Sequence, residues 1–251
     1  MVTLADKPPT SRLKEMVESG IAVDILDADR AWFLVDELRD RELPSLVQPF
    51  ADALKGLAIV HLTLAVVKLF EKSKGYPLRN IPQALDLLAQ GANELPIGNR
   101  PAVEARLGRR FGIPPGLPDA ELNRQIEARF RETLPNCDYR GTNLESCRTL
   151  EELKTWRDKR MAHAEAAQAD TFRAIELPAV WRLLAYAKGF LGVIGLAYTA
   201  VAYDTDDGHY FLSDDAKWTA MAFRRMVKGN AEPHPAPFAT RGKGKRSSES
   251  F

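Results

Sequence analysis

Apolar and polar positions follow a helical period along most of the chain, and two stretches are apolar almost without interruption. The first runs from Gly56 to Val67 and the second from Gly189 to Tyr203. Both are shorter than the ~20 residues that a helix needs to cross a bilayer, and charged residues stand at both ends of each. We therefore expect two buried core helices, an all-α fold and no contact with a membrane.

Capping residues and prolines divide the rest of the chain into further helices. Asp27 or Asp29 can cap the first helix, Asn80 the third and Thr149 the sixth, because short polar side chains accept hydrogen bonds from the first helical turn. Prolines and glycines mark several of the ends. The predicted helices cover residues 27–41, 44–72, 80–89, 100–111, 119–134, 149–169, 178–203 and 214–227.

Changes in composition suggest how these helices are organised. Residues 24–228 are predicted to form one helical bundle, preceded by an N-terminal extension, residues 1–23. Within the bundle, residues 91–147 are rich in proline and arginine and lack long apolar stripes, which favours an inserted helical segment or lid. Residues 229–251 are rich in Pro, Gly, Ser and Lys, which predicts a disordered basic tail.

The overall composition is typical of a soluble protein of the cytoplasm. The 251 residues are 45% hydrophobic, enough for one sizeable core. The 35 basic and 34 acidic residues nearly balance, so an RNA-binding surface would have to be a local patch. Asp6 and Glu15 interrupt the N-terminal region where an export signal would need an apolar run, and we therefore predict a cytoplasmic location.

The sequence shows no motif for a metal or a cofactor. Cys137 and Cys147 have no histidine beside them, which excludes the usual spacing of a zinc site. The acidic loop at residues 204–209 lacks the glutamate that closes a calcium loop at its twelfth position. We expect that the protein uses neither a metal nor a cofactor.

Three glycines in the second apolar run recur every third residue, at positions 189, 192 and 195. A glycine row of this kind lets another segment approach the helix closely. The approaching segment can belong to the same chain or to a second copy, and the sequence favours internal packing slightly.

The strongest candidate site is Arg-Asp-Lys-Arg-Met-Ala-His, residues 157–163. Arginine binds phosphate through paired N–H groups, and histidine titrates near neutral pH. These groups suit metal-free cleavage of RNA, in which His163 would move a proton, Arg157 would bind the charge on the phosphoryl oxygens and Asp158 would orient either group. Lys159 and Arg160 would add contacts to the substrate. The same spacing also fits a solvated helix face with ordinary ion pairs.

The two functional groups of this motif point in different directions. His163 follows Arg157 by six positions, so on one helix it lies about 9 Å along the axis and about 120° around it. One helix therefore does not aim both side chains at one atom, whereas two chains paired about a two-fold axis can share a pocket.

The remaining histidines carry no spacing that indicates a site. His61 lies inside the first apolar run, which favours a core residue whose ring is hydrogen-bonded, although it could face the same interior as His163. His209 and His234 fall in predicted loops.

The motif and its neighbouring helices resemble the HEPN superfamily, most closely its abortive-infection branch, the AbiU-like proteins. The motif, the apolar stretch at residues 56–70 and the segment Ile-Pro-Gln-Ala-Leu-Asp-Leu-Leu at residues 81–88 carry this resemblance, which covers about Asp24 to Tyr203. It implies an all-α bundle, a homodimer whose motifs face each other, and often a metal-independent ribonuclease activity in phage defence or as a toxin. The motif arginine and histidine correspond to Arg157 and His163.

The chain departs from this family at two positions. Asp158 stands where many members have Asn, and its negative charge can hold Arg157 back from a phosphate. Glu165 stands where members regulated by a nucleotidyltransferase antitoxin carry Tyr, which argues against that route of regulation. An antitoxin or defence partner of another kind stays an expectation.

Three functional hypotheses follow. The first is a dimeric ribonuclease that acts on RNA through Arg157, Asp158 and His163. The second is a non-catalytic helical module that binds a nucleotide, RNA or a partner protein, because many HEPN domains only bind. The third is an apolar scaffold on which the motif is a surface accident.

Overall fold

The computed structural model describes residues 7–39, 45–71, 79–135, 144–158, 176–205 and 209–228. The α-helices are α1 Pro9–Met16, α2 Ala22–Arg39, α3 Gln48–Phe70, α4 Ile81–Gln90, α5 Arg100–Phe111, α6 Asp119–Thr133, α7 Leu144–Arg157, α8 Leu177–Ile194 and α9 Phe211–Lys228. Two π-helical stretches, η2 Val17–Ile21 and η5 Gly195–Thr199, continue α1 and α8. Over these ranges no strand forms beyond one isolated bridge between Asp204 and Tyr210. The prediction of an all-α fold is confirmed.

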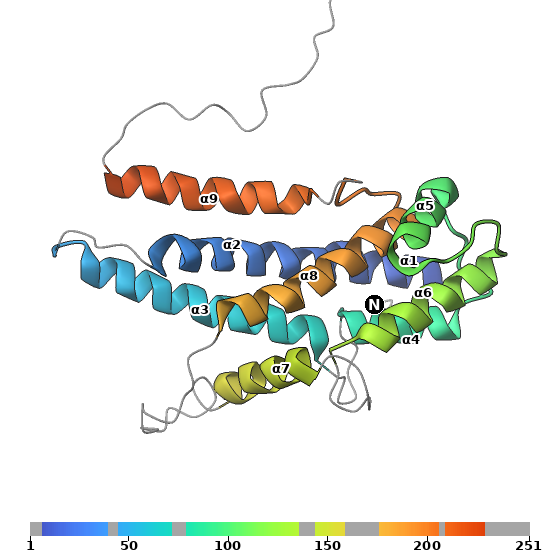
Figure 1. Cartoon of the computed structure of the whole chain (residues 1–251), viewed down its shortest axis with the longest axis horizontal. Coiled ribbons are helices and arrows are strands. Elements are labelled where there is room, and N and C mark those ends of the chain that lie inside the picture. Colours follow the sequence, from blue (N-terminus) through green and yellow to red (C-terminus); the bar gives the residue numbers. More distant parts are fainter. Residues whose placement is uncertain are drawn as a thin grey trace, which may run out of the picture.

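Three long helices lie side by side in the bundle. Figure 1 shows α2 between α3 and α9 with nearly parallel axes, and α2 packs against both of them. α8 crosses this layer at an angle and contacts α2, α3 and α7. α4, α5 and α6 gather at one end of the bundle (Figure 1).

The N-terminal segment belongs to the same core as the rest of the bundle. Leu13, Met16 and Ile21 are buried in the main hydrophobic cluster together with residues of α3 and α8. The predicted start of the first helix at Asp27 or Asp29 is wrong, because helical structure runs from Pro9 to Arg39 without a break. The predicted boundary at residue 24 therefore falls inside a continuous helical segment.

Helices α5 and α6, in the segment predicted as an insertion, also contribute to this core. Val103 and Leu107 in α5, and Leu122, Ile126 and Phe130 in α6, are fully buried. Their four-residue spacing makes a narrow apolar stripe on helices that are otherwise charged, and such a stripe suffices for packing. A role of residues 91–147 as a lid stays a prediction.

Local capping explains where α4 begins. The side-chain oxygen of Asn80 accepts a hydrogen bond from the Gln83 N–H at 3.2 Å. The prediction that Asn80 caps this helix is confirmed.

The glycine row of α8 serves internal packing. A Cβ added at Gly189 would meet the guanidinium of Arg110, and one at Gly192 would meet the carboxylate of Asp204. One at Gly195 would lie 2.4 Å from the ring of Tyr203. The first of the two alternatives, packing within the chain, accounts for these three positions.

Within the described ranges, two helical segments are long and apolar enough to cross a membrane by length and composition, α3 and Leu177–Thr199. In the second, 67% of the most apolar window is buried inside the protein, compared with 44% in α3. The absence of membrane contact stays a prediction. The C-terminal tail at 229–251, Cys137 and His234 lie outside the described residues.

Candidate functional site

The first part of the motif lies at the end of α7, a helix that packs against α3 and α8. Leu150, Leu153 and Trp156 recur every third residue and are buried, so they hold one face of α7 on the bundle. Arg157 follows the last of these buried residues. The predicted start of this helix at Thr149 is wrong, since Thr149 lies inside α7, which begins at Leu144, and its hydroxyl donates to the Glu145 carbonyl at 2.9 Å.

Two carboxylates hold the guanidinium of Arg157. Its Nη1 donates to Glu71 Oε1 at 3.1 Å, and its Nε donates to Asp158 Oδ1 at 2.8 Å. The Arg157 side chain is only 23% exposed. Because Glu71 directly follows α3, these contacts join the end of the motif helix to the end of α3.

Glu71 is itself fixed by the start of α4. The Asn80 side-chain nitrogen donates to the Glu71 carbonyl oxygen at 2.6 Å, and Asn80 is almost fully buried. Phe70, the last residue of α3, is buried in the core. A chain of hydrogen bonds therefore runs from the buried cap of α4 through Glu71 to Arg157.

The charges around Arg157 do not cancel. Burial lowers the pKa of the Arg157 guanidinium, but the hydrogen bonds that it donates to Asp158 and Glu71 outweigh burial and raise its pKa overall. Among the described residues one cation faces two carboxylates, so these three side chains together carry a net negative charge. The two bonds use Nε and Nη1, and among the described residues no hydrogen bond uses the N–H groups of Nη2. A phosphate would bind there or displace one of the carboxylates.

Arg157 and Asp158, which are adjacent in the chain, are joined by a hydrogen bond between their side chains. Lys159, Arg160 and His163 lie outside the described residues, so their position beside Arg157 stays a prediction. Glu71 was not among the residues predicted from the sequence to lie beside the motif. One signal could have indicated it, because a glutamate just after the C-terminus of a helix is unfavourable to the helix dipole unless a cation neutralises it.

The two described histidines, His61 and His209, lie on the surface. The His61 side chain is 56% exposed, with Nε2 3.8 Å from Asp27 Oδ2, so the prediction of a core residue is wrong. The reason is that His61 lies beside the groove between α2 and α3, where its ring approaches the Asp27 carboxylate of α2 but stays open to solvent. His209 Nε2 lies 2.8 Å from Asp214 Oδ2 at the start of α9.

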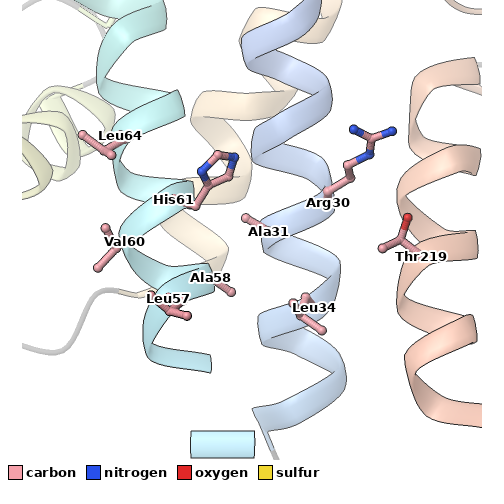
Figure 2. Close-up of a pocket in the computed structure, with 9 residues that line it drawn as sticks. All are labelled: Arg30, Ala31, Leu34, Leu57, Ala58, Val60, His61, Leu64 and Thr219. Atoms are coloured by element: carbon pink, nitrogen blue, oxygen red, sulfur yellow. The ribbon is translucent and has the colours of Figure 1, made fainter. Parts of the chain in front are cut away.

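A groove of about 430 Å³ lies on the bundle between α2 and α3, with one residue from α9. Figure 2 shows its lining, which is mostly aliphatic and includes His61 and Arg30. Of the two motif residues that the structure describes, neither Arg157 nor Asp158 lines it. In the described part of the chain, no group of three or more His, Cys, Asp or Glu side chains is placed to hold a metal ion.

The comparisons with known proteins agree with this architecture. A family model described as AbiU2, of the HEPN type, matches residues 12–218. That range begins inside α1 and ends inside α9, so it includes the N-terminal helices that the core requires. No curated protein and no solved structure matches the chain. The chain belongs to the AbiU2 family of HEPN proteins.

Proposed function

We propose that this protein is a metal-independent endoribonuclease of the HEPN type that acts in phage defence or as a toxin. The arrangement of Arg157 carries this proposal, because a half-buried arginine held by two fixed carboxylates is an oriented cation of the kind that phosphoryl chemistry uses. Family membership supports an abortive-infection role for the chain.

The reaction needs one nucleophile, one proton acceptor, one proton donor and one cation. The 2′-hydroxyl of RNA attacks the adjacent phosphorus, the bond to the 5′-oxygen breaks, and a 2′,3′-cyclic phosphate and a 5′-hydroxyl end form. His163 takes the proton from the 2′-hydroxyl or delivers one to the leaving 5′-oxygen, and water accepts or supplies the other proton. Arg157 binds the charge that develops on the phosphoryl oxygens.

Asp158 and Glu71 act as positioning residues in this proposal. Each accepts a hydrogen bond from Arg157, and together they fix the plane of the guanidinium. A fixed guanidinium loses less entropy when it binds a phosphate than a mobile one does. Lys159 and Arg160 extend the positive surface towards neighbouring phosphates of the RNA.

The proposed active form is a homodimer in the cytoplasm, without contact with a membrane. Arg157 and His163 point in different directions from one helix, so a second copy completes a composite pocket. An antitoxin or another defence partner would control this activity in the cell, since an unregulated ribonuclease is toxic.

A second candidate function is a non-catalytic module that binds a nucleotide, RNA or a partner protein. The net negative charge of the Arg157 group favours it, because Glu71 and Asp158 compete with any phosphate for the guanidinium. This module would bind its ligand without turnover.

Incubation of total RNA with the purified protein in EDTA tests the choice between the two. The ribonuclease leaves 2′,3′-cyclic phosphate ends, and His163→Ala abolishes cleavage while circular dichroism shows an intact fold. His209→Ala is the matched control, because it removes an exposed histidine that is paired with Asp214, away from the motif. A folded protein that binds labelled RNA without cleaving it would favour the second candidate.

A further inference from the structure

The side chain of Asn80 makes two hydrogen bonds to different parts of the bundle. Its Oδ1 accepts from the Gln83 N–H at 3.2 Å and caps α4, while its Nδ2 donates to the Glu71 carbonyl oxygen at 2.6 Å. Capping needs only an acceptor, which serine, threonine or aspartate would also supply. Asparagine differs from these residues in carrying an amide donor beside its acceptor. The bond to Glu71 is therefore a second use of this side chain, separate from the cap.

The main chain of Glu71 lies where this second bond controls the carboxylate. Glu71 directly follows α3 and leaves helical geometry, with φ −69° and ψ 136°. The last carbonyl groups of a helix have no partner within the helix. The Asn80 amide holds the Glu71 carbonyl, and Asn80 is 2% exposed, so water does not weaken this bond. The Glu71 side chain therefore extends from a fixed backbone.

The residue before Asn80 is seated on the N-terminal helical segment. A Cβ added at Gly20, in the π-helical stretch η2, would meet the Cβ of Arg79 and lie 2.5 Å from the Arg79 carbonyl oxygen. Glycine is the residue that admits another backbone this closely. The Arg79 side chain also donates to Glu15 of α1 at 2.6 Å. The start of α4 is thus fixed from two sides, by η2 and by α1.

We propose that Asn80 is a positioning residue for Arg157, on which it acts through Glu71. Arg157 Nη1 donates to Glu71 Oε1 at 3.1 Å, and the Arg157 side chain is 23% exposed. A carboxylate on a fixed backbone restricts the guanidinium to fewer orientations than one on a loose chain, so less entropy is lost when a phosphate binds. The effect on RNA cleavage rests on the proposed function, whereas the order of the guanidinium is a property of the protein alone.

Two variants remove the amide donor and keep the cap. Asn80→Asp keeps the shape of the side chain but adds a charge. Asn80→Ser is neutral, and its hydroxyl is too short to reach the Glu71 carbonyl from the capping position. Both keep an oxygen that accepts from the Gln83 N–H. An effect that both variants share comes from the lost donor, because their other changes differ. Asn99→Asp and Asn99→Ser are the matched controls, since Asn99 precedes α5 and its side chain makes no capping bond.

The exchange of the Arg157 Nε–H proton with water measures the order of the guanidinium in the full chain without RNA. Nitrogen–proton NMR records it, and loss of the signal in Arg157→Lys assigns it. Wild type should exchange slowly, because Nε donates to Asp158 Oδ1 at 2.8 Å. Both Asn80 variants should speed exchange about fivefold, and the Asn99 variants less than about twofold, with urea unfolding confirming that each is folded. Fast exchange in wild type, or an unchanged rate in either Asn80 variant, would overturn the proposal.

A double variant tests whether Asn80 acts through Glu71. If it does, adding Asn80→Ser to Glu71→Ala should leave the exchange rate of Arg157 Nε–H as it is in Glu71→Ala alone, because the carboxylate that Asn80 positions is already absent. If the effects of the two substitutions multiply, Asn80 acts on Arg157 by another route and the proposal fails.

RNA cleavage separates this proposal from the proposed function. In a cleaving protein, Asn80→Ser should lower kcat about fivefold at an unchanged KM, and by no more than Glu71→Ala does. A raised KM at an unchanged kcat would overturn the positioning role. If wild type cleaves no RNA and the Arg157 signal still responds to Asn80, the ribonuclease proposal fails and the positioning stands. If wild type cleaves RNA and the signal does not respond, the positioning alone fails.

Discussion

The two helical segments α3 and Leu177–Thr199 have the same length, 23 residues, and both are apolar enough to cross a membrane. They differ in what covers them. The second is enclosed by α2, α7 and η2, and its glycines admit side chains from α5 and from the segment after η5. α3 is covered along one face and exposes the other. Apolar composition therefore indicates that a helix packs against another apolar surface. The arrangement of the neighbouring elements determines whether the same chain supplies that surface.

The sharpest test of this comparison replaces the same residue type in both helices. Phe190 in α8 is fully buried, whereas Phe50 in α3 is 57% exposed. Phe190→Ala should lower the free energy of unfolding by about 3–5 kcal/mol, because it leaves a cavity in the core. Phe50→Ala should lower it by less than about 1 kcal/mol, measured by urea unfolding at a protein concentration at which the chain is monomeric. Equal losses would show that Phe50 is buried in the single chain.

A second test concerns the buried ion pair of α8. Lys188 Nζ lies 2.6 Å from Asp29 Oδ1 and donates to Ser213 Oγ at 2.9 Å. Burial lowers the pKa of Lys188, although Asp29 acts in the opposite direction. Lys188→Met should lower the free energy of unfolding by about 3 kcal/mol, because it leaves the Asp29 carboxylate buried without its cation. Adding Asp29→Asn should recover part of that loss in the same unfolding experiment, and no recovery would show that Lys188 contributes through packing alone.

Replacing glycine by alanine should change the free energy of unfolding in opposite directions in the two helices. A Cβ at Gly195 would lie 2.4 Å from the Tyr203 ring, whereas nothing lies within 4 Å of a Cβ at Gly56. Gly195→Ala should lower the free energy of unfolding by roughly 2 kcal/mol through overpacking. Gly56→Ala should raise it by up to about 1 kcal/mol, because alanine favours the helix. Thermal unfolding of both variants measures the two signs, and a destabilised Gly56→Ala would indicate an unseen contact at that position.

Glu71, at the C-terminal end of α3, is expected to affect RNA cleavage through its hydrogen bond to Arg157 rather than through apolar packing. Glu71→Ala removes the acceptor for Arg157 Nη1 and should lower the rate of RNA cleavage about tenfold, since a loss of about 1.4 kcal/mol corresponds to that factor. Glu71→Gln keeps an acceptor and should restore most of the rate. Glu127→Gln, which removes a half-buried carboxylate paired with Arg131 on α6, is the matched control. A faster Glu71→Ala enzyme would show that Glu71 competes with the phosphate instead of positioning Arg157.

Features that depend on neighbouring residues could be predicted from the sequence. The cap at Asn80 was correct because its bond to the Gln83 N–H closes within three residues. The apolar periods likewise located α3, α4, α5, α6 and α8. Thr149 has the right residue type for a cap but lies inside a helix, because packing of α7 against α3 and α8 extends the helix to Leu144.

Features that depend on distant residues could not be predicted in this way. Glu71 and Arg157 stand 86 positions apart in the chain and meet only because α3 and α7 end side by side. His61 lies in an apolar run and looked like a core residue, but its exposure depends on which face of α3 the other helices cover. The motif itself was recognisable because its residues are contiguous.

Single-turnover cleavage of RNA in EDTA by Arg157→Lys, compared with wild type, tests the central claim most directly. Lysine keeps the positive charge but cannot donate to Glu71 and Asp158 while also presenting a planar pair of N–H groups to a phosphate. We expect the cleavage rate to fall about 100-fold with the fold and the dimer intact. A rate within about twofold of a cleaving wild type would contradict the role of the oriented guanidinium, and with it the site described above.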